Sequence, residues 1–460
     1  MTMKRLMLVW VMLLCLVPLG AWAEEETAPA LYPIRENGLW GYMNRAGEVV
    51  IEPQWANLSP WYGDYAAATP DGQHWGIIDR NGETVLPFEY QIGWEDTCRV
   101  MSVYAFGFSR ARMHEEPTYP VCGVFDTRSG TFSGLQWREV KLAWRAEDDL
   151  LPVKDMNGLW GYVNASTGEE EIACQFVYAD CFQEGWAGVT FEKDLPNNSY
   201  CFDALINAKG ELLHAPEGMA IGGWNGVSGG WIDIVDEQTW LWGYMDTTGR
   251  VVLAPQFDGS VSGFHGSFAV VDNLEDDIWY IDRSGRRLPG VIPMAEGDLG
   301  YGFFNGIETV FAQSEKDGFV YEAAMDEEGK ILFVLDDLDL SAYLGPFFQE
   351  NRAWYAEGYD APDDTWGDSG YYQFGLIDRS GTILTDSCFR CLGEYGSPFC
   401  EGVAAVSLDG KWGYIDEDAQ WVIPAQYDKA ASFSDGLALV EKDGKLMYID
   451  HSEAAVWEER

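Results

Sequence analysis

The sequence predicts an all-β fold of tandem antiparallel β-meander repeats, and three observations lead to this prediction. First, a phrase recurs in which Trp-Gly-Tyr is followed by an apolar residue, Asp or Asn, and a glycine-containing turn. Second, apolar and polar residues alternate over five or six positions within each copy, which is typical of strands. Third, Gly and Pro interrupt the apolar runs, so helical content should be small. The clearest copies lie at 37–55, 158–176, 241–257 and 411–427.

The copy nearest the carboxy terminus shows how one unit should fold. Strands are expected at 402–407, 411–416 and 421–424, and the Asp409-Gly410 pair between the first two favours a tight hairpin turn. The third strand ends in a proline, which cannot donate to a strand ladder. Gly413, after the motif tryptophan, should let a neighbouring backbone or ring approach closely. Each unit is therefore expected to be an antiparallel meander of three or four short strands.

Degenerate copies fill most of the intervals between the clear ones. They lie at 74–82, 122–130, 201–210, 279–285, 323–329, 374–381 and 446–450. Repetition at this spacing is typical of propellers, solenoids and arrays. About ten or eleven units result, which is more than the blade number of a typical propeller. We therefore expect an open array or superhelix in which each unit packs on its neighbours, with a β-propeller as the alternative.

The repeated phrase resembles the repeats of the WG repeat family of bacterial, often exported, β-rich proteins. The resemblance spans residues 33–450, and five units carry the Trp-Gly pair itself. It implies a repeat architecture and a binding or scaffolding role at the cell envelope, and it implies no catalytic residues. We expect the motif tryptophans to be structural and to stack in the core. They are Trp40, Trp75, Trp160, Trp242 and Trp412.

The first 23 residues have the layout of a secretory signal peptide, with a basic start, an apolar run and an Ala-Trp-Ala cleavage site. Cleavage after Ala23 would leave repeats at 24–210 and 236–460, separated by a Gly- and Trp-rich break at 211–235. No second apolar run is long enough for a transmembrane span. The protein is therefore expected to be secreted or associated with the cell envelope.

The composition limits the classes of partner. The chain has 75 acidic and 29 basic residues and a net charge of −46. Such a charge repels phosphate backbones, so nucleic-acid binding is not expected. Hydrophobic residues make up 47% of the chain, which argues against disorder as the reason for the acidity. A polysaccharide or a protein at the cell envelope is the expected partner.

Eight cysteines remain after the signal peptide, and an even number in an exported chain predicts disulfides. The pair at 388 and 391 forms a C-x-x-C, but its surroundings are rich in turns and poor in helix signals, which disfavours a redox site. No second pair or nearby histidine completes a zinc site. The cysteines are Cys98, Cys122, Cys174, Cys181, Cys201, Cys388, Cys391 and Cys400.

Aromatic residues outside the repeated phrase are the candidates for binding. Flat rings beside amides and carboxylates suit sugars, because the rings cover apolar sugar faces and the polar groups bind hydroxyls. The alternative is ordinary packing within loops. One set lies in the glycine-rich break and another around an acidic segment at 357–370. The candidates are Trp224, Asn225, Trp231, Trp354, Tyr359 and Trp366.

Ca²⁺ is the one cofactor for which the sequence offers ligands. Four carboxylates of the acidic segment could form an irregular site: Asp360, Asp363, Asp364 and Asp368. Asp337-x-Asp339-x-Ser341 begins like an EF-hand loop, but the glycine and the bidentate glutamate that such a loop requires are missing. No other cofactor is expected.

No catalytic motif is convincing, so an enzyme is not expected. The stretch at 226–230 matches G-x-S-x-G, but a strand rather than a helix is predicted after it. The abundance of acids makes any carboxylate pair uninformative. We expect a non-catalytic binding or scaffold protein that presents a β-repeat surface. The alternatives are a structural or adhesive envelope protein and a glycan-acting hydrolase with an Asp/Glu pair.

Overall fold

The computed structural model describes residues 29–93, 100–105, 120–142, 150–191, 201–223, 226–272, 278–293, 306–340, 342–347, 352–358, 372–393 and 396–459. Within these ranges the chain forms antiparallel strands, β1 to β43, and one short 3₁₀ turn, η2 (Asp336–Leu338). The all-β fold with tandem antiparallel meanders is therefore confirmed.

The described strands group into nine sheets, two of which contain two repeat units each, so that eleven units follow one another. The first four units comprise β1 (Leu31–Glu36), β2 (Leu39–Asn44) and β3 (Val49–Trp55); β4 (Asn57–Tyr62), β5 (Tyr65–Thr69), β6 (Trp75–Asp79) and β7 (Thr84–Gly93); β8 (Val100–Ala105), β9 (Cys122–Asp126) and β10 (Thr131–Phe132); and β11 (Glu139–Val140), β12 (Leu150–Lys154), β13 (Trp160–Asn164) and β14 (Glu170–Phe176).

The next three units occupy the middle of the chain. They comprise β15 (Tyr178–Ala179), β16 (Trp186–Thr190), β18 (Ala204–Asn207) and β19 (Leu212–Leu213); β17 (Cys201–Phe202), β20 (Met219–Gly222), β21 (Val227–Ser228), β22 (Trp231–Asp236), β23 (Leu241–Asp246) and β24 (Val251–Asp258); and β25 (Ser260–Val261), β26 (Phe268–Asp272) and β27 (Ile278–Asp282).

The last four units complete the chain. They comprise β28 (Val291–Pro293), β29 (Ile307–Gln313), β30 (Val320–Asp326) and β31 (Ile331–Val334); β32 (Ala342–Phe347), β33 (Arg352–Gly358), β34 (Tyr372–Asp378) and β35 (Ile383–Cys391); β36 (Phe399–Cys400), β37 (Val403–Leu408), β38 (Lys411–Asp416) and β39 (Trp421–Tyr427); and β40 (Lys429–Ala430), β41 (Leu437–Lys442), β42 (Lys445–Asp450) and β43 (Ala455–Glu458).

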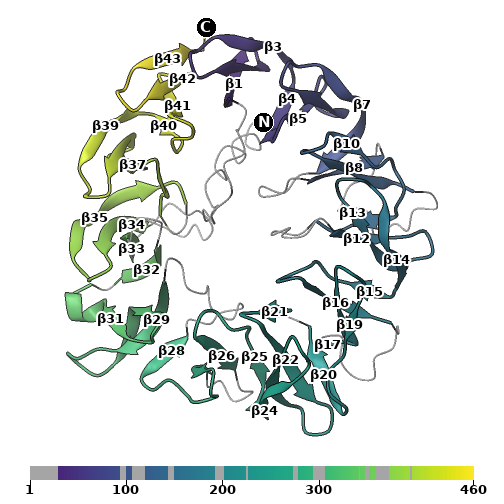
Figure 1. Cartoon of the computed structure of the whole chain (residues 1–460). Coiled ribbons are helices and arrows are strands. Elements are labelled where there is room, and N and C mark those ends of the chain that lie inside the picture. The colour runs from purple at the N-terminus through teal and green to yellow at the C-terminus, as the bar shows by residue number, and fades with distance from the viewer. Residues whose placement is uncertain are drawn as a thin grey trace, which may run out of the picture.

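The units follow one another around a ring, and the last unit lies beside the first (Figure 1). One apolar cluster joins the two ends, with Tyr32 and Ile34 from β1 and Tyr448 and Trp457 from the last unit. The repeats therefore form the expected array, and its two ends meet, as in the β-propeller given as the alternative. Closure buries apolar strand faces that an open array would leave exposed at both ends.

Polar contacts also hold the two ends together. The Tyr32 hydroxyl donates to the Asp435 carbonyl at 2.6 Å, and the Tyr448 hydroxyl donates to the Pro33 carbonyl at 3.0 Å. The Arg35 guanidinium contacts the Glu459 carboxylate at 2.9 Å. Tyr32 and Tyr448 are also packed edge to face, with ring centroids 5.6 Å apart.

The glycine of the repeated phrase has a steric role. In the first unit Trp40 faces Trp55 and Tyr42 faces Ile51, so three residues of β3 bulge over the single Gly41. The same bulge recurs in the tenth unit, where a Cβ on Gly413 would lie 2.5 Å from the Ile423 carbonyl oxygen. The predicted close approach of a neighbouring backbone is confirmed.

The tyrosine of the phrase links each unit to the next. The Tyr42 ring is fully buried, and its hydroxyl donates to the Ser59 carbonyl in the second unit at 2.9 Å. Tyr162, Tyr244 and Tyr414 repeat this contact at 2.8 Å, each with a carbonyl 17 or 18 residues further along. A buried phenol with a satisfied hydroxyl thus fixes the distance between successive units.

The acidic or amide residue that ends the same strand organises the following turn. In the first unit the Asn44 Oδ1 atom accepts the backbone N–H groups of Ala46 and Glu48 at 2.9 and 3.0 Å. Side chains of this kind stabilise turns by replacing a backbone acceptor. Turns of this type follow Asn44, Asp79, Asp126, Asn164, Asn207, Asp246, Asp282, Asp326, Asp378, Asp416 and Asp450.

The segment at 211–235, expected to be a break, contains repeat strands. β19 pairs with β18 in the fifth unit, whereas β20, β21 and β22 belong to the sheet of the sixth. That sheet runs from residue 201 to 258 and so crosses the expected boundary. The glycines here form turns between short strands, so the ring continues across this segment.

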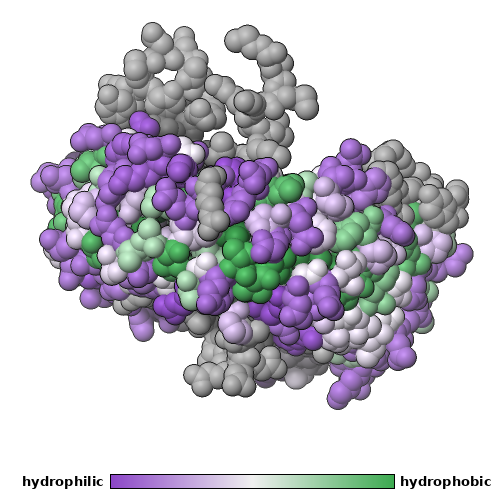
Figure 2. Space-filling model, turned by 90° about the horizontal axis from the view of Figure 1, so that it is seen from above, coloured by the Kyte–Doolittle hydropathy of each residue, from purple (hydrophilic) through white to green (hydrophobic). Residues whose placement is uncertain are grey.

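The outer rim carries apolar residues from the third strand of each unit. Seen edge-on in Figure 2, apolar surface lies between hydrophilic margins. Val49 and Val50 of β3, Val85 of β7 and Val422 of β39 are among the exposed apolar residues. The third strands of the first, sixth and tenth units carry a bulge and a proline, which hinder pairing with another strand edge.

Candidate functional site

Four exposed apolar residues of the eighth and ninth units form the candidate site, which we call the 319–372 surface. Phe319 is 71% exposed, Tyr343 59%, Val320 46% and Tyr372 39%. Phe319 follows the hairpin turn between β29 and β30, Val320 begins β30, Tyr343 lies on β32, and Tyr372 begins β34. Exposed aromatic groups on a folded frame mark interaction sites.

Strand pairing brings these residues to the same end of the two units. Ala342 of β32 pairs with Glu357 of β33, and Gly358 pairs with Tyr372 of β34. The Tyr343 and Tyr372 rings are in edge-to-face contact, with centroids 5.9 Å apart and planes at 88°. The eighth unit joins them because the Glu322 carboxylate of β30 accepts the backbone N–H of Leu344.

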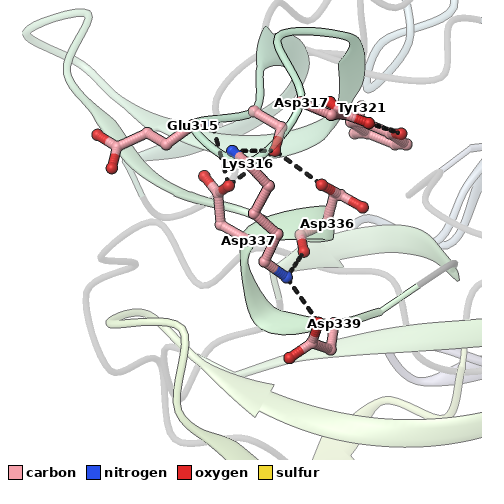
Figure 3. A network of polar contacts seen from close by, with 8 residues as sticks. Glu315, Lys316, Asp317, Tyr321, Asp336, Asp337 and Asp339 are labelled. Carbon is pink, nitrogen blue, oxygen red and sulfur yellow. Dashed lines mark hydrogen bonds and ion pairs between the residues drawn. The ribbon is translucent and has the colours of Figure 1, made fainter.

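A polar network adjoins this surface (Figure 3). The Ser314 hydroxyl oxygen lies 2.7 Å from the Asp336 carboxylate and 2.8 Å from the Asp337 carboxylate, either of which can accept its one proton, and this joins the β29–β30 hairpin to the turn η2. On the other side of the hairpin, the Tyr321 hydroxyl donates to Asp317 at 2.8 Å. The hairpin beside the 319–372 surface is therefore held in one conformation.

Lys316 supplies the cation of this network. Its ammonium group donates to the Asp336 carbonyl and lies 2.8 Å from the Asp339 carboxylate, which raises the lysine pKa. Asp337 and Asp339, which begin the EF-hand-like segment, thus contact Ser314 and Lys316 of the β29–β30 hairpin.

Trp231, one of the candidate sugar-binding residues, is half-buried in an aromatic cluster. Its ring lies 4.7 Å from Phe264 and 5.7 Å from Tyr244. The Arg283 guanidinium lies 5.0 Å from the Trp231 ring centroid and covers it. The neighbouring Gly229 carbonyl accepts a hydrogen bond from the same guanidinium. These contacts favour packing between the sixth and seventh units over an open sugar platform.

Trp354 is fully buried, which corrects its prediction as a binding residue. Its indole N–H donates to the Ser397 carbonyl at 2.7 Å, and its ring stacks on Phe399 with centroids 6.0 Å apart. Sequence alternation could not reveal this, because Trp354 lies on β33 between two packed units. It contributes to the core of the ninth and tenth units.

The other candidates lie outside the described residues. They are Trp224, Asn225, Tyr359 and Trp366 for sugar binding, and Asp360, Asp363, Asp364 and Asp368 for calcium. Within the described ranges, no group of three or more His, Cys, Asp or Glu residues is arranged to hold a metal ion. The 319–372 surface was missed in the sequence, although an apolar residue directly after the Asp317-Gly318 turn was a usable signal.

Four of the five motif tryptophans lie in or against apolar clusters that join neighbouring units. Trp160 is buried in the cluster joining the fourth and fifth units. Trp75, Trp242 and Trp412 are partly buried and pack against clusters that their own unit shares with the next one. Trp40 is partly buried below the Arg35 guanidinium, 5.8 Å from its ring centroid. The fully buried aromatic residue of the phrase is its tyrosine.

The expected disulfides are not formed at five of the cysteines. Cys122, Cys174, Cys201, Cys388 and Cys391 carry thiols. Cys98 lies outside the described residues. Burial raises the pKa of the Cys391 thiol to about 12 and that of the Cys201 thiol to about 11, so both are poor nucleophiles. The C-x-x-C pair therefore lacks the reactivity of a redox site.

Two residues that resemble catalytic groups have structural roles. Ser228 of the G-x-S-x-G stretch is buried, and its hydroxyl donates to the Phe264 carbonyl at 2.9 Å. Burial raises the pKa of Glu308 to about 7, but this side chain is only 4% exposed and accepts a hydrogen bond from Tyr280. Neither is accessible to a substrate.

Comparison with known proteins identifies the repeats. The model of the WG containing repeat family matches five segments, each beginning at one of the five motif tryptophans: 40–72, 75–91, 160–193, 242–273 and 412–445. This confirms the resemblance found in the sequence. No curated protein has a significantly similar sequence. In the part of the chain that the structure describes, no helix has the length and apolarity needed to cross a membrane.

Solved structures show only distant likeness. The computationally designed Ika8 protein gives a TM-score of 0.27 at 13% identity, covering 78% of this chain and 94% of that one. The extracellular domain of a putative hybrid two component system from B. thetaiotaomicron gives 0.22 at 11%, covering 94% and 64%. BamB from Moraxella catarrhalis gives 0.23 at 10%, covering 67% and 94%. Likeness at this level carries no argument about function.

Proposed function

We propose that this chain, a protein of WG containing repeats, is a non-catalytic binding scaffold that holds a polysaccharide or protein partner on its ring. The observation that carries the proposal is the 319–372 surface, where Phe319 and Tyr343 are more than half exposed. Exposed apolar groups that gather on one face of a folded protein mark interaction surfaces. Export through the predicted signal peptide would bring this surface to the cell envelope.

The frame suits this role because it holds the surface in place. The Tyr42-type hydrogen bonds connect successive units, and the seam between Tyr32 and Tyr448 closes the ring. A binding surface on rigid strands loses little conformational entropy when the partner docks. The scaffold would therefore contribute geometry rather than chemistry.

Binding to insoluble polysaccharides and peptidoglycan, and capture of a protein partner from cell-envelope extract, test the proposal. The protein used is the expected mature chain, residues 24–460. The Phe319→Ser/Tyr343→Ser double variant should lose binding, because it removes the two most exposed rings of the 319–372 surface. Trp240→Ser is the matched control, since Trp240 is also an exposed aromatic residue (44%) but belongs to the sixth unit. A double variant that binds as well as the wild type would contradict the proposed site.

A further inference from the structure

We infer that the 319–372 surface docks a protein segment that carries lysine and arginine side chains. This inference rests on the proposed binding function and names its partner class. It is drawn from three features of the molecule: the charge of the whole chain, the carboxylates beside the exposed rings, and the angle between those rings.

The charge of the chain selects among partners. At a net charge of −46, a second copy, a nucleic acid or an anionic polysaccharide would be repelled. Many basic side chains are already engaged within the ring. Ion pairs join Arg35 to Glu459, Arg80 to Asp64, Arg352 to Asp418, Lys411 to Asp428 and Lys429 to Glu441. A cationic partner is the one that this field attracts.

Acidic side chains also outnumber basic ones in the immediate surroundings of the exposed rings. The polar network beside the rings contains the carboxylates of Asp317, Asp336, Asp337 and Asp339, and Lys316 is the cation drawn with them (Figure 3). The Asp339 side chain is 94% exposed although it pairs with Lys316, and so can accept a second cation. The Asp317 carboxylate accepts the backbone N–H of Phe319, which places a negative charge beside the most exposed ring. A lysine or arginine that packs on that ring would meet a carboxylate.

Elsewhere in the chain, lysine and arginine side chains lie over aromatic rings. The Lys141 ammonium lies 3.7 Å from the Tyr178 ring centroid and 4.6 Å from that of Trp160. Arg283 covers Trp231 and Phe264. Aromatic faces attract ammonium and guanidinium groups through their quadrupole. At the 319–372 surface, no lysine or arginine among the described residues makes a cation–π contact with Phe319, Tyr343 or Tyr372.

The angle between the rings argues against a sugar platform. Tyr343 and Tyr372 meet at 88°, so the two rings do not form one flat platform on which a sugar could stack. Perpendicular rings form a corner, into which the methylene stem of a lysine or arginine can pack while its charged end reaches a carboxylate. The geometry thus favours a cationic protein segment over a neutral polysaccharide.

A labelled twelve-residue peptide of alternating lysine and alanine is the probe, and the peptide with glutamate in place of lysine is its control. Affinity is measured by fluorescence anisotropy with residues 24–460 in 50 and 300 mM NaCl. The lysine peptide should bind, more weakly at high salt, and the glutamate peptide should not. Phe319→Ser/Tyr343→Ser should weaken binding at least tenfold, Asp339→Asn about threefold, and Trp240→Ser should leave it unchanged. Circular dichroism checks that each variant is folded.

Four results would overturn the inference. Equal affinity of the double variant and the wild type would mean that the peptide binds the acidic surface anywhere. If Trp240→Ser weakens peptide binding as much as the double variant does, the peptide also binds without preference for the 319–372 surface. If the lysine peptide does not bind while a polysaccharide is retained through Phe319 and Tyr343, the partner class is wrong and the proposed function stands. If neither binds, both fail.

Discussion

Replacing Glu308 by glutamine should remove a pH dependence of stability that the wild-type protein shows between pH 5 and pH 8. Glu308 lies on β29 in the core of the eighth unit and is 4% exposed. Its Oε1 atom accepts a hydrogen bond from the Tyr280 hydroxyl of the seventh unit at 2.6 Å. Burial raises the pKa of the carboxyl from 4.5 to about 7, and the Tyr280 hydrogen bond offsets only part of this effect.

The direction and the size of this pH dependence follow from the pKa values of the Glu308 carboxyl in the unfolded and the folded protein. Between pH 4.5 and 7 the folded protein keeps the proton on Glu308, whereas the unfolded chain releases it. The free energy of unfolding therefore decreases as the pH rises through this range and becomes level above it. A difference of 2.5 pKa units corresponds to about 3 kcal/mol, because each unit is worth about 1.4 kcal/mol. The stabilisation is complete below pH 4.5 and lost above pH 7.

Urea unfolding followed by tryptophan fluorescence at pH 5, 6, 7 and 8 measures this dependence. The wild type should lose about 3 kcal/mol more than Glu308→Gln over this range. Glu169→Gln replaces an exposed glutamate and should follow the wild type. Burial also raises the pKa of Glu322, which is present in all three proteins, so the difference between curves isolates Glu308. Parallel curves for the wild type and Glu308→Gln would refute the reasoning.

Three further predictions concern the packing of the repeat units and the burial of a cysteine. Gly413→Ala places a Cβ 2.5 Å from the Ile423 carbonyl oxygen and should cost about 1–3 kcal/mol in urea unfolding; an unchanged midpoint would contradict the bulge. Tyr32→Ala should open the ring seam, so that amide hydrogen exchange accelerates in β1 and β43 but not in β22. Exchange that stays slow would argue against closure. Cys391, whose thiol pKa burial raises to about 12, should resist iodoacetamide at pH 8 until urea unfolds the chain. Rapid alkylation of the folded protein would show that the thiol is accessible.

The repeat architecture could be predicted because its signals are local. The Asp409-Gly410 turn, the alternation through Trp412 and Tyr414, and the glycine between them all act within one unit. A bulge that leaves no room for a side chain selects glycine wherever it recurs, so the sequence displays it at every clear copy. The number of units was predictable for the same reason.

The closure of the ring depended on contacts between distant residues. Tyr32 and Asp435 are separated by 403 positions, and no local sequence pattern in either segment predicts their contact. The small rotation between successive units adds up around the chain, and that rotation is set by packing between sheets. The repeated phrase is compatible with both an open array and a ring.

The candidate site also combines features that local sequence predicts with features that depend on contacts between units. Trp354 and Tyr343 both stand on strands of the ninth unit, yet one is fully buried and the other is 59% exposed. Strand alternation assigns residues to two faces but does not say which face a neighbouring unit covers. Phe319 is exposed because it follows the hairpin turn between β29 and β30, at the edge of its unit.

The sequence by itself determined the β-meander unit, the approximate number of its copies and the acidic character of the chain. These properties depend on local steric demands and on composition, which a single chain displays directly. Only the tertiary structure decided that the ring closes and that Phe319 and Tyr343 remain in solvent. It also placed Glu308 in a core that favours its protonated form. Those outcomes depend on which surfaces of separate units come into contact, because burial is a property of the packed pair of units.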